Sequence, residues 1–243
     1  MKMNEMTDIH CHLLPGVDDG ARDMADCEEL LSIAAADGIR HIVFTPHVRR
    51  PWLKRTKAET EEVFGRVREI AAGRFPELTL YLGTEFAFSE SILQEEKEKL
   101  QDLNGSGVLL TEFRPHDPFS RICEGIQQVQ MAGYDVLLAH IERYDCMLED
   151  IDRAYRVAEL GAMIQVNADD IASPMSFRMG RWLKKLMAAR LIHAAGSDAH
   201  DAKYRRPELS KARAIVAKRC GEEYAEELFH TNGLKILEKG SVN

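Results

Sequence analysis

Asp8-Ile9-His10-Cys11-His12 places two imidazoles two residues apart at the end of an apolar run near the start of the chain. On an extended strand, residues i and i+2 project to the same face, so both rings can converge on one metal ion without distortion of the backbone. A His-x-His pair taken alone is a moderate signal, because such pairs are more often solvated or hydrogen-bonded. Metal chemistry is therefore the first hypothesis, and it needs support from the rest of the sequence.

The same segment opens a series of short apolar runs that alternate with amphipathic stretches. This pattern is typical of strand-helix units that build a mostly parallel sheet, and it predicts an α/β fold. Seven strands are expected, at residues 6–10, 41–45, 78–83, 107–113, 135–140, 162–167 and 191–197. The clearest helices are expected at residues 24–36, 56–72 and 121–131, the second with a capping box formed by Thr56 and Glu59.

Six of the seven expected strands end in residues that can bind a metal. In a barrel of parallel strands the carboxyl ends share one face, where active sites are built, so residues far apart in the sequence would come together there. The candidate ligands are His10, His12, Asp18, His47, Glu85, Glu112, His140, Asp198 and His200. Imidazoles mixed with carboxylates suit Mn, Fe or Zn better than calcium, which prefers oxygen ligands. The set is too large for one ion, so two or three divalent ions are expected.

Length and composition narrow the class of protein. At 243 residues the chain is as long as one α/β barrel, and we expect a single domain over residues 1–243. The net charge of -8 argues against a nucleic-acid partner. No stretch is long and apolar enough to cross a bilayer, and the first residues are too polar to start a signal peptide. The five scattered cysteines are typical of a reducing compartment. We therefore expect a soluble, cytoplasmic protein without membrane insertion, and the composition leaves its oligomeric state open.

Further segments carry a resemblance to a known family. They are Gly16-Val17-Asp18-Asp19-Gly20, Thr45-Pro46-His47, Gly83-Thr84-Glu85, His140-Ile141-Glu142-Arg143-Tyr144, Gln165-Val166-Asn167 and Ser197-Asp198-Ala199-His200. With the opening segment, they resemble the PHP (polymerase and histidinol phosphatase) superfamily. Within it, the chain is similar to the metal-dependent tyrosine phosphatases of bacterial capsule and exopolysaccharide loci, the CpsB/CapC type.

The resemblance implies a distorted seven-stranded, TIM-like barrel with three metal ions, commonly manganese. It also implies hydrolysis of phosphotyrosine on a cognate bacterial tyrosine kinase. Carried over by position, one ion would take His10, His12, Glu85 and Asp198, a second would take Glu85, Glu112 and His140, and the third would take Asp18, His47 and His200. The segment Val48-Arg49-Arg50-Pro51-Trp52 lacks an expected glycine, and this departure concerns the substrate contacts more than the metal site.

Clustered metals suit the hydrolysis of a phosphate monoester. A water that bridges two ions is expected to lose its proton near neutral pH and to attack in line, while the ions screen the charge on the phosphoryl oxygens. No cysteine is followed six positions later by arginine, so a cysteine-dependent phosphate loop is absent. Arginine suits the remaining role, because its planar fork holds two phosphate oxygens at once. Arg143 is the first candidate, and Arg206 is the second.

Two other functions fit parts of this pattern. A phosphatase of the same superfamily acting on histidinol phosphate or another small phosphomonoester would use a similar cluster. The basic residues after His47, namely Arg49, Arg50, Lys54, Arg55 and Lys57, favour an acidic phosphopeptide over an amine. A non-catalytic metal-binding scaffold is disfavoured because every expected ligand position carries a ligating side chain.

Overall fold

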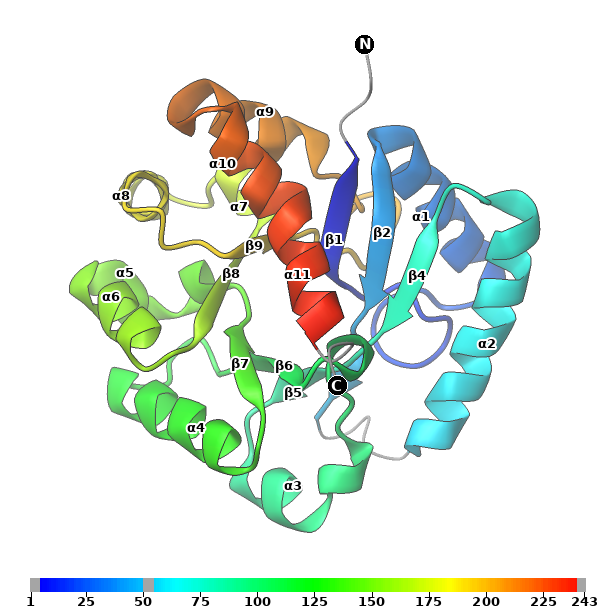
Figure 1. The fold of residues 1–243 in the computed structure, drawn as a ribbon, viewed down its shortest axis with the longest axis horizontal. Coiled ribbons are helices and arrows are strands. Elements are labelled where there is room, and N and C mark those ends of the chain that lie inside the picture. Colours follow the sequence, from blue (N-terminus) through cyan, green and yellow to red (C-terminus); the bar gives the residue numbers. More distant parts are fainter. Residues whose placement is uncertain (1–4, 50–54, 240–243) are drawn as a thin grey trace.

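The computed structural model describes residues 5–49 and 55–239. It is an α/β fold in which the strands lie inside and most helices lie around the periphery (Figure 1). The strands are β1 (Met6–Cys11), β2 (Ile39–Phe44), β3 (His47–Val48), β4 (Thr79–Leu82), β5 (Glu85–Ala87), β6 (Val108–Glu112), β7 (Asp135–Leu138), β8 (Met163–Asn167) and β9 (Ala194–Gly196).

All strand pairings are parallel, as the alternating pattern predicted. One sheet has the order β1-β2-β4, and the other has the order β3-β5-β6-β7-β8-β9. The end of β1 also meets the segment after β9, because Cys11 pairs in parallel with Ala199 and the Asp198 N–H donates to the carbonyl of His10 at 2.8 Å. The first and last strands of the chain are therefore neighbours.

Each of the seven expected strand ranges overlaps a strand, and two short strands were not expected. β3 and β5 continue the paths of β2 and β4 after the interruptions Thr45-Pro46 and Gly83-Thr84. Pro46 has no N–H to donate, so it cannot continue the pairing of β2. The strands resume at His47 and Glu85, which are candidate ligands. These two residues therefore begin short strands, whereas the sequence placed them directly after longer ones.

The three expected helices are present within one or two residues of their predicted bounds. The helices are α1 (Met24–Asp37), α2 (Lys57–Arg74), α3 (Glu90–Glu95), α4 (Phe119–Met131), α5 (Asp145–Glu149), α6 (Asp152–Glu159), α7 (Ala168–Ala172), α8 (Phe177–Ala188), α9 (Ser210–Cys220), α10 (Glu222–Glu226) and α11 (Asn232–Glu238). The capping box of Thr56 and Glu59 is formed at the start of α2. No helix within residues 5–49 and 55–239 has both the length and the apolar character needed to cross a bilayer.

The apolar core has two parts. The larger cluster packs the helices on the outside of the strands, for example through Ile122, Ile126 and Val129 of α4. The smaller cluster lies among the strands and includes Ile9 of β1 and Leu137 of β7, together with Ile236 and Leu237 of α11. Burial on both faces keeps the strands in place, so that their carboxyl ends hold polar side chains at defined positions.

Candidate metal centre

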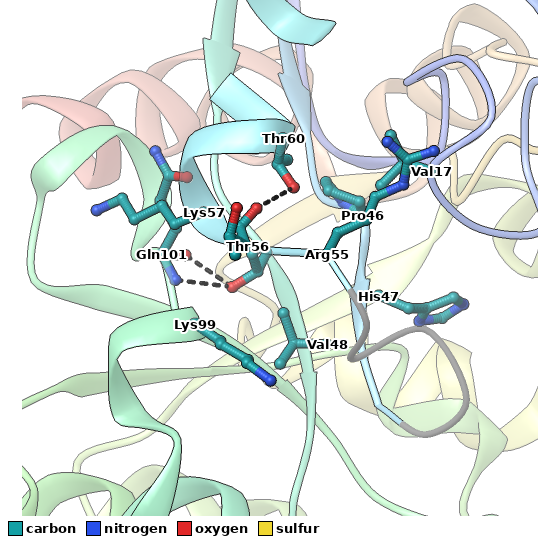
Figure 2. Close-up of a pocket in the computed structure, with 11 residues that line it drawn as sticks. Val17, Pro46, His47, Val48, Arg55, Thr56, Lys57, Thr60, Lys99 and Gln101 are labelled. Atoms are coloured by element: carbon teal, nitrogen blue, oxygen red, sulfur yellow. Dashed lines mark hydrogen bonds between the residues drawn. The ribbon is translucent and has the colours of Figure 1, made fainter. Parts of the chain in front are cut away.

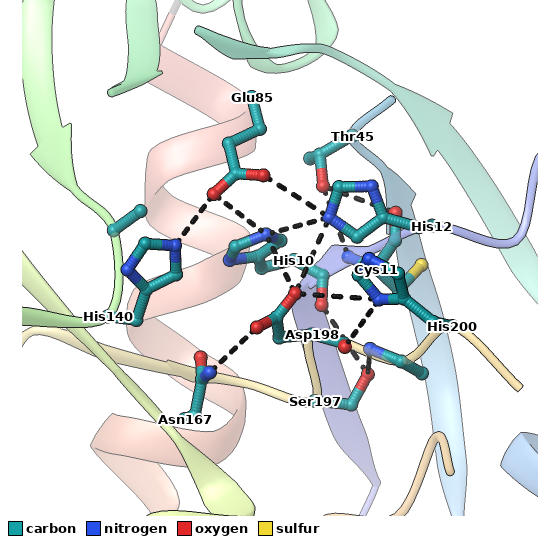
Figure 3. A network of polar contacts seen from close by, with 12 residues as sticks. His10, Cys11, His12, Thr45, Glu85, His140, Asn167, Ser197, Asp198 and His200 are labelled. Atoms are coloured by element: carbon teal, nitrogen blue, oxygen red, sulfur yellow. Dashed lines mark hydrogen bonds and ion pairs between the residues drawn. The ribbon is translucent and has the colours of Figure 1, made fainter. Parts of the chain in front are cut away.

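Eight of the nine predicted ligands lie together at the carboxyl ends of the strands. They are His10, His12, His47, Glu85, Glu112, His140, Asp198 and His200, and all are buried. Figure 3 shows that the side chains of His10, His12, Glu85 and Asp198 point toward one another, with His140 and His200 at the two sides. The parallel topology thus brings together residues from opposite ends of the chain, as expected from their positions at strand ends.

The centre of the cluster is built around Glu85. Its Oε1 lies 3.4 Å from Nε2 of His10 and 2.8 Å from Nε2 of His140. Its Oε2 lies 3.3 Å from Nε2 of His12 and 2.8 Å from Nδ1 of His47. One carboxylate therefore contacts four imidazoles from three strand ends, which is the arrangement expected of a ligand that bridges two ions.

Asp198 and Glu112 complete this group from either side. Oδ1 of Asp198 lies 3.5 Å from Nε2 of both His10 and His12. Oε1 of Glu112 lies 3.5 Å from Nδ1 of His47, and Oε2 lies 3.8 Å from Nε2 of His140. The two carboxylates thus lie near different pairs of imidazoles, and each pair shares Glu85.

The side chains fit divalent ions for two reasons. First, Nε2 of His10 and Nε2 of His12 are only 3.1 Å apart, and a cation between them would bind both lone pairs. Second, Oε2 of Glu85 and Oε1 of Glu112 are buried without a well-oriented hydrogen-bond donor among the described residues. Buried acceptors without donors are costly, and a metal ion removes that cost.

The electrostatics of the cluster also favour bound cations. Burial alone would lower the pKa of His47 and His140, and His12 lowers that of His47 further. The surrounding carboxylates nevertheless raise these two pKa values to about 10 and about 9. Burial would raise the pKa of Glu85, but the nearby histidines hold it well below its usual range. The carboxylates of the site therefore strongly favour bound cations, and metal ions would have to displace protons from its histidines.

Asp18 and Asp19, which are adjacent in the sequence, occupy different positions. The side chain of Asp18, the predicted ligand, is fully buried behind His12, and its Oδ2 lies 2.8 Å from His12 Nδ1 and accepts the His47 N–H at 3.0 Å. Oδ1 of Asp19 lies 3.3 Å from Nε2 of His47 and 3.6 Å from Nε2 of His200. The geometry therefore favours Asp19 over Asp18 as a direct ligand, a distinction that sequence reasoning missed because both are carboxylates of one loop.

Three arginines face the open side of the cluster, and Arg206 is not one of them. A cavity of about 460 Å³ over the metal ligands is lined by Arg49, Arg143 and Arg205. Arg143 Nε donates to buried Asp170 at 2.8 Å, and Arg205 lies 2.5 Å from Asp198. Arg206, the second predicted phosphate contact, bonds instead to Glu208 and to a backbone carbonyl. The adjacent Arg205 is the residue that the sequence analysis missed.

A basic pocket lies beside the cluster at the start of α2 (Figure 2). Its lining includes His47, Val48, Arg55, Lys57 and Lys99. Of the basic residues singled out in the sequence, Arg50 and Lys54 lie outside the described residues. The pocket places positive charge next to His47, as the composition of this segment suggested.

Cys11 lies between two candidate ligands but is not poised for catalysis. Its side chain is fully buried, and its thiol donates to the carbonyl of Val43 at 3.2 Å. Burial raises the pKa of this thiol well above its usual range. A thiolate nucleophile at Cys11 is therefore disfavoured, in agreement with the missing cysteine-arginine motif.

A parallel α/β fold whose strand ends gather imidazoles and carboxylates under half-buried arginines is typical of a metal-dependent hydrolase of anionic substrates. Residues 6–238 match the family described as capsular polysaccharide synthesis, CpsB/CapC, and the chain belongs to this family.

The relatives and solved structures agree with this assignment. The chain is 32% identical over 238 residues to the tyrosine-protein phosphatase CpsB of Streptococcus pneumoniae, covering 96% of this chain and 98% of that protein. It is 32% identical over 220 residues to the tyrosine-protein phosphatase YwqE of Bacillus subtilis, covering 90% and 86%. A crystal structure from work on YwqE and CpsB, described as unique metal-dependent tyrosine phosphatases, superposes with a TM-score of 0.88 at 30% identity, over 96% of this chain and 95% of that one. Histidinol phosphate phosphatase of Lactococcus lactis shares the fold, with a TM-score of 0.60 at 14% identity, over 88% and 94% of the two chains.

Proposed function

We propose that this chain is a metal-dependent protein-tyrosine phosphatase that hydrolyses phosphotyrosine without a cysteine nucleophile. The observation that carries the proposal is the buried cluster of imidazoles and carboxylates around Glu85, beneath Arg143 and Arg205. Two relatives named tyrosine-protein phosphatases match over 90% or more of the chain, and a structure described as one of metal-dependent tyrosine phosphatases superposes over 96% of it. The proposed architecture is a distorted seven-stranded barrel in one domain over residues 1–243, supported by the contact between the end of β1 and the segment after β9.

We assign two or three divalent ions to the cluster, with manganese first and iron or zinc as alternatives. One ion would be held by His10, His12, Glu85 and Asp198, and a second by Glu85, Glu112 and His140. A third would be held by His47 and His200 together with Asp19, which replaces Asp18 in the set derived from the resemblance. Asp18 then supports His12 from behind, as carboxylates commonly do for metal-binding histidines.

When bound, the ions supply a hydroxide near neutral pH and neutralise charge on the phosphoryl oxygens. The chain's own residues bind and orient the substrate. Arg143 is held by Asp170 and presents its guanidinium to the cavity, where it can bind two phosphate oxygens. Arg205 faces the same cavity from the segment after His200 and can bind a third oxygen. The phosphate contact predicted for Arg206 stays a prediction, and the geometry favours Arg205 for that contact.

The proposed substrate is a phosphotyrosine-containing protein, most simply a cognate bacterial tyrosine kinase that controls capsule or exopolysaccharide synthesis. The basic side chains beside His47 support an acidic phosphopeptide, because Arg55, Lys57 and Lys99 lie close together there. A cytoplasmic location is part of the proposal and is supported by five free cysteines, Cys11, Cys27, Cys123, Cys146 and Cys220.

The decisive experiment is hydrolysis of a phosphotyrosine peptide by the purified protein, with manganese, with a chelator, and with a His10→Ala control. The proposal expects manganese-dependent phosphate release that is lost in the variant and resists thiol alkylation. Histidinol phosphate is assayed in parallel. Turnover of histidinol phosphate without turnover of the peptide would replace the proposal by its small-molecule alternative. Bound metal without hydrolysis of any phosphomonoester would favour a non-catalytic scaffold.

A further inference from the structure

Of the seven strand ranges expected from the sequence, only 162–167, where β8 lies, carries no candidate metal ligand at its carboxyl end, and it ends instead in two buried amides, Gln165 and Asn167. We propose that Gln165 and Asn167 are positioning residues that orient three metal ligands, His10, His140 and Asp198. The inference rests on the proposed metal site but adds residues to which that proposal gives no role.

The direction of each hydrogen bond in this group follows from one backbone donor. The His140 N–H donates to Oε1 of Gln165 at 2.7 Å, so this atom is the amide oxygen. The same oxygen lies 3.3 Å from Nδ1 of His10, and since an amide oxygen only accepts, Nδ1 carries the proton. The lone pair of His10 is therefore on Nε2, the atom that faces Glu85, His12 and Asp198.

The NH₂ group of Gln165 begins a chain of hydrogen bonds that runs through Asn167 to Asp198, called the relay below. Nε2 of Gln165 donates to Oδ1 of Asn167 at 2.9 Å, and Nδ2 of Asn167 donates to Oδ2 of Asp198 at 2.9 Å. Asp198 thus keeps Oδ1 directed at His10 and His12. Figure 3 shows the Asn167 amide directed at the Asp198 carboxylate from the side opposite Glu85.

The backbone supports the same conclusion. His140 and Asp198 are two of only four non-glycine residues in the described chain with positive φ, at 30° and 53°. Such conformations are unfavourable for L residues and persist where surrounding contacts hold them. Gln165 accepts from the backbone N–H of His140, and Asn167 donates to the side chain of Asp198, so the relay contacts both of the ligands with this unfavourable backbone.

The test measures manganese binding in Gln165→Leu, Asn167→Ala and Gln130→Leu. Gln130 is a matched control because its amide donates to the Leu160 carbonyl at 2.8 Å, in α4 and away from the cluster. Each protein is stripped of metal, checked by circular dichroism, and titrated with manganese by calorimetry. We expect the Kd to rise about 10- to 100-fold in Gln165→Leu, to rise less in Asn167→Ala, and to stay unchanged in Gln130→Leu.

The dependence of turnover on manganese concentration distinguishes a positioning role from a merely structural one. With saturating manganese, kcat of Gln165→Leu should return close to the wild-type value, because neither amide lines the substrate cavity. If Gln165→Leu does not fold, Asn167→Ala decides alone. Wild-type Kd values in the folded variants would overturn the inference, and so would equal weakening in Gln130→Leu.

A second inference rests on a different feature, a groove with one aromatic wall that opens from the cavity over the metal ligands. The two hollows share Arg49, Glu112, Phe113 and Pro115, and the groove continues along Phe88 and Ile92. The rings of Phe88 and Phe113 lie 5.2 Å apart and form its aromatic wall. We infer that this groove receives the aromatic ring of the phosphotyrosine, a refinement that depends on the proposed phosphatase function.

The geometry explains how the enzyme would distinguish aryl from alkyl phosphates. Glu112 belongs both to the ligand cluster and to the groove, so a phosphate at the cluster places its ester group at the mouth of the groove. A phenyl ring attached there can pack against Phe88 and Phe113. A phosphoserine side chain carries no ring to fill this space.

The test narrows the groove with Ser89→Trp and uses Ser91→Trp as the matched control. Ser89 lines the groove, whereas exposed Ser91 does not, and their hydroxyls are 3.0 Å apart. We expect Ser89→Trp to raise KM for a phosphotyrosine peptide about 10-fold. A loss of this size is typical when a substrate group no longer packs in an apolar site. Inhibition by inorganic phosphate, which occupies only the metal side, should not change.

Equal KM values for wild type and Ser89→Trp would overturn the groove assignment alone, as would the same rise in Ser91→Trp. A wild-type protein that hydrolyses no phosphotyrosine would instead overturn the proposed function, and the groove assignment with it. The two failures are therefore distinguishable.

Discussion

Nδ1 of His12 lies 2.8 Å from a carboxylate oxygen of Asp18, and both side chains are fully buried. This contact holds the imidazole so that Nε2 faces Glu85 and Asp198. It also explains why Asp18 is not available to the cluster itself. The adjacent Asp19 takes the position near His47 and His200.

The first prediction separates these two carboxylates. Asp19→Asn should lose one manganese ion per chain, because it removes a direct ligand. Asp18→Asn should keep the full number of ions but bind them about 10-fold more weakly, as is typical when the partner of a metal-binding histidine is removed. Metal content after equilibrium dialysis, measured by mass spectrometry, gives both values. Loss of one ion in Asp18→Asn alone would restore Asp18 as the ligand.

The second prediction concerns Arg143. Arg143→Ala should lower kcat/KM for a phosphotyrosine peptide about 100-fold or more, because a charged donor to the phosphate is lost. Manganese content should not change, since Arg143 bonds Asp170 and no metal ligand. Arg156→Ala, on the exposed face of α6 where it pairs with Glu159, is the control and should keep full activity. Wild-type turnover in Arg143→Ala would remove this residue from the mechanism.

The third prediction compares two adjacent arginines. Arg205→Ala should lower kcat/KM by about 10-fold or more, because Arg205 lines the cavity over the ligands. Arg206→Ala should stay close to wild type, since its guanidinium bonds Glu208 and a carbonyl outside that cavity. Steady-state kinetics on the same peptide decides between them. A larger loss in Arg206→Ala would confirm the sequence-based choice over the structural one.

The fourth prediction concerns acid stability and His193, which precedes β9. Burial lowers the pKa of this imidazole, and its Nδ1 accepts the Ile164 N–H at 3.0 Å, which requires the neutral ring. Below the unfolded-state pKa of about 6.5, the unfolded chain binds a proton that the folded chain does not, so stability falls as the pH falls. His193→Asn keeps an acceptor near this position without titrating, and should lose less stability on acidification.

Urea unfolding of metal-free protein at several pH values tests this difference. His116→Asn is the matched control, because His116 is highly exposed and pairs with Asp145 on the surface. Equal acid losses in wild type and His193→Asn would show that His193 does not control this part of the pH profile.

Much of the fold could be predicted because its signals are local. Strand and helix periodicity located β1, β6 and α4 closely, and the Thr56-x-x-Glu59 pattern predicted the start of α2. The interruptions that create β3 and β5 were not predicted. They depend on pairing with neighbouring strands, which periodicity along one segment does not describe.

By itself, the sequence determined the chemical identity of the site, because imidazoles and carboxylates placed at the ends of parallel strands must meet at one edge. It did not determine which of two adjacent, chemically similar residues faces that edge. Asp19 rather than Asp18, and Arg205 rather than Arg206, point to the cavity because loop dihedrals are set by contacts with distant segments, such as the Asp18 bond to the His47 N–H. The relay through Gln165 and Asn167 likewise exists only where β8 lies beside β7 and β9, since its hydrogen bonds join residues far apart in the chain.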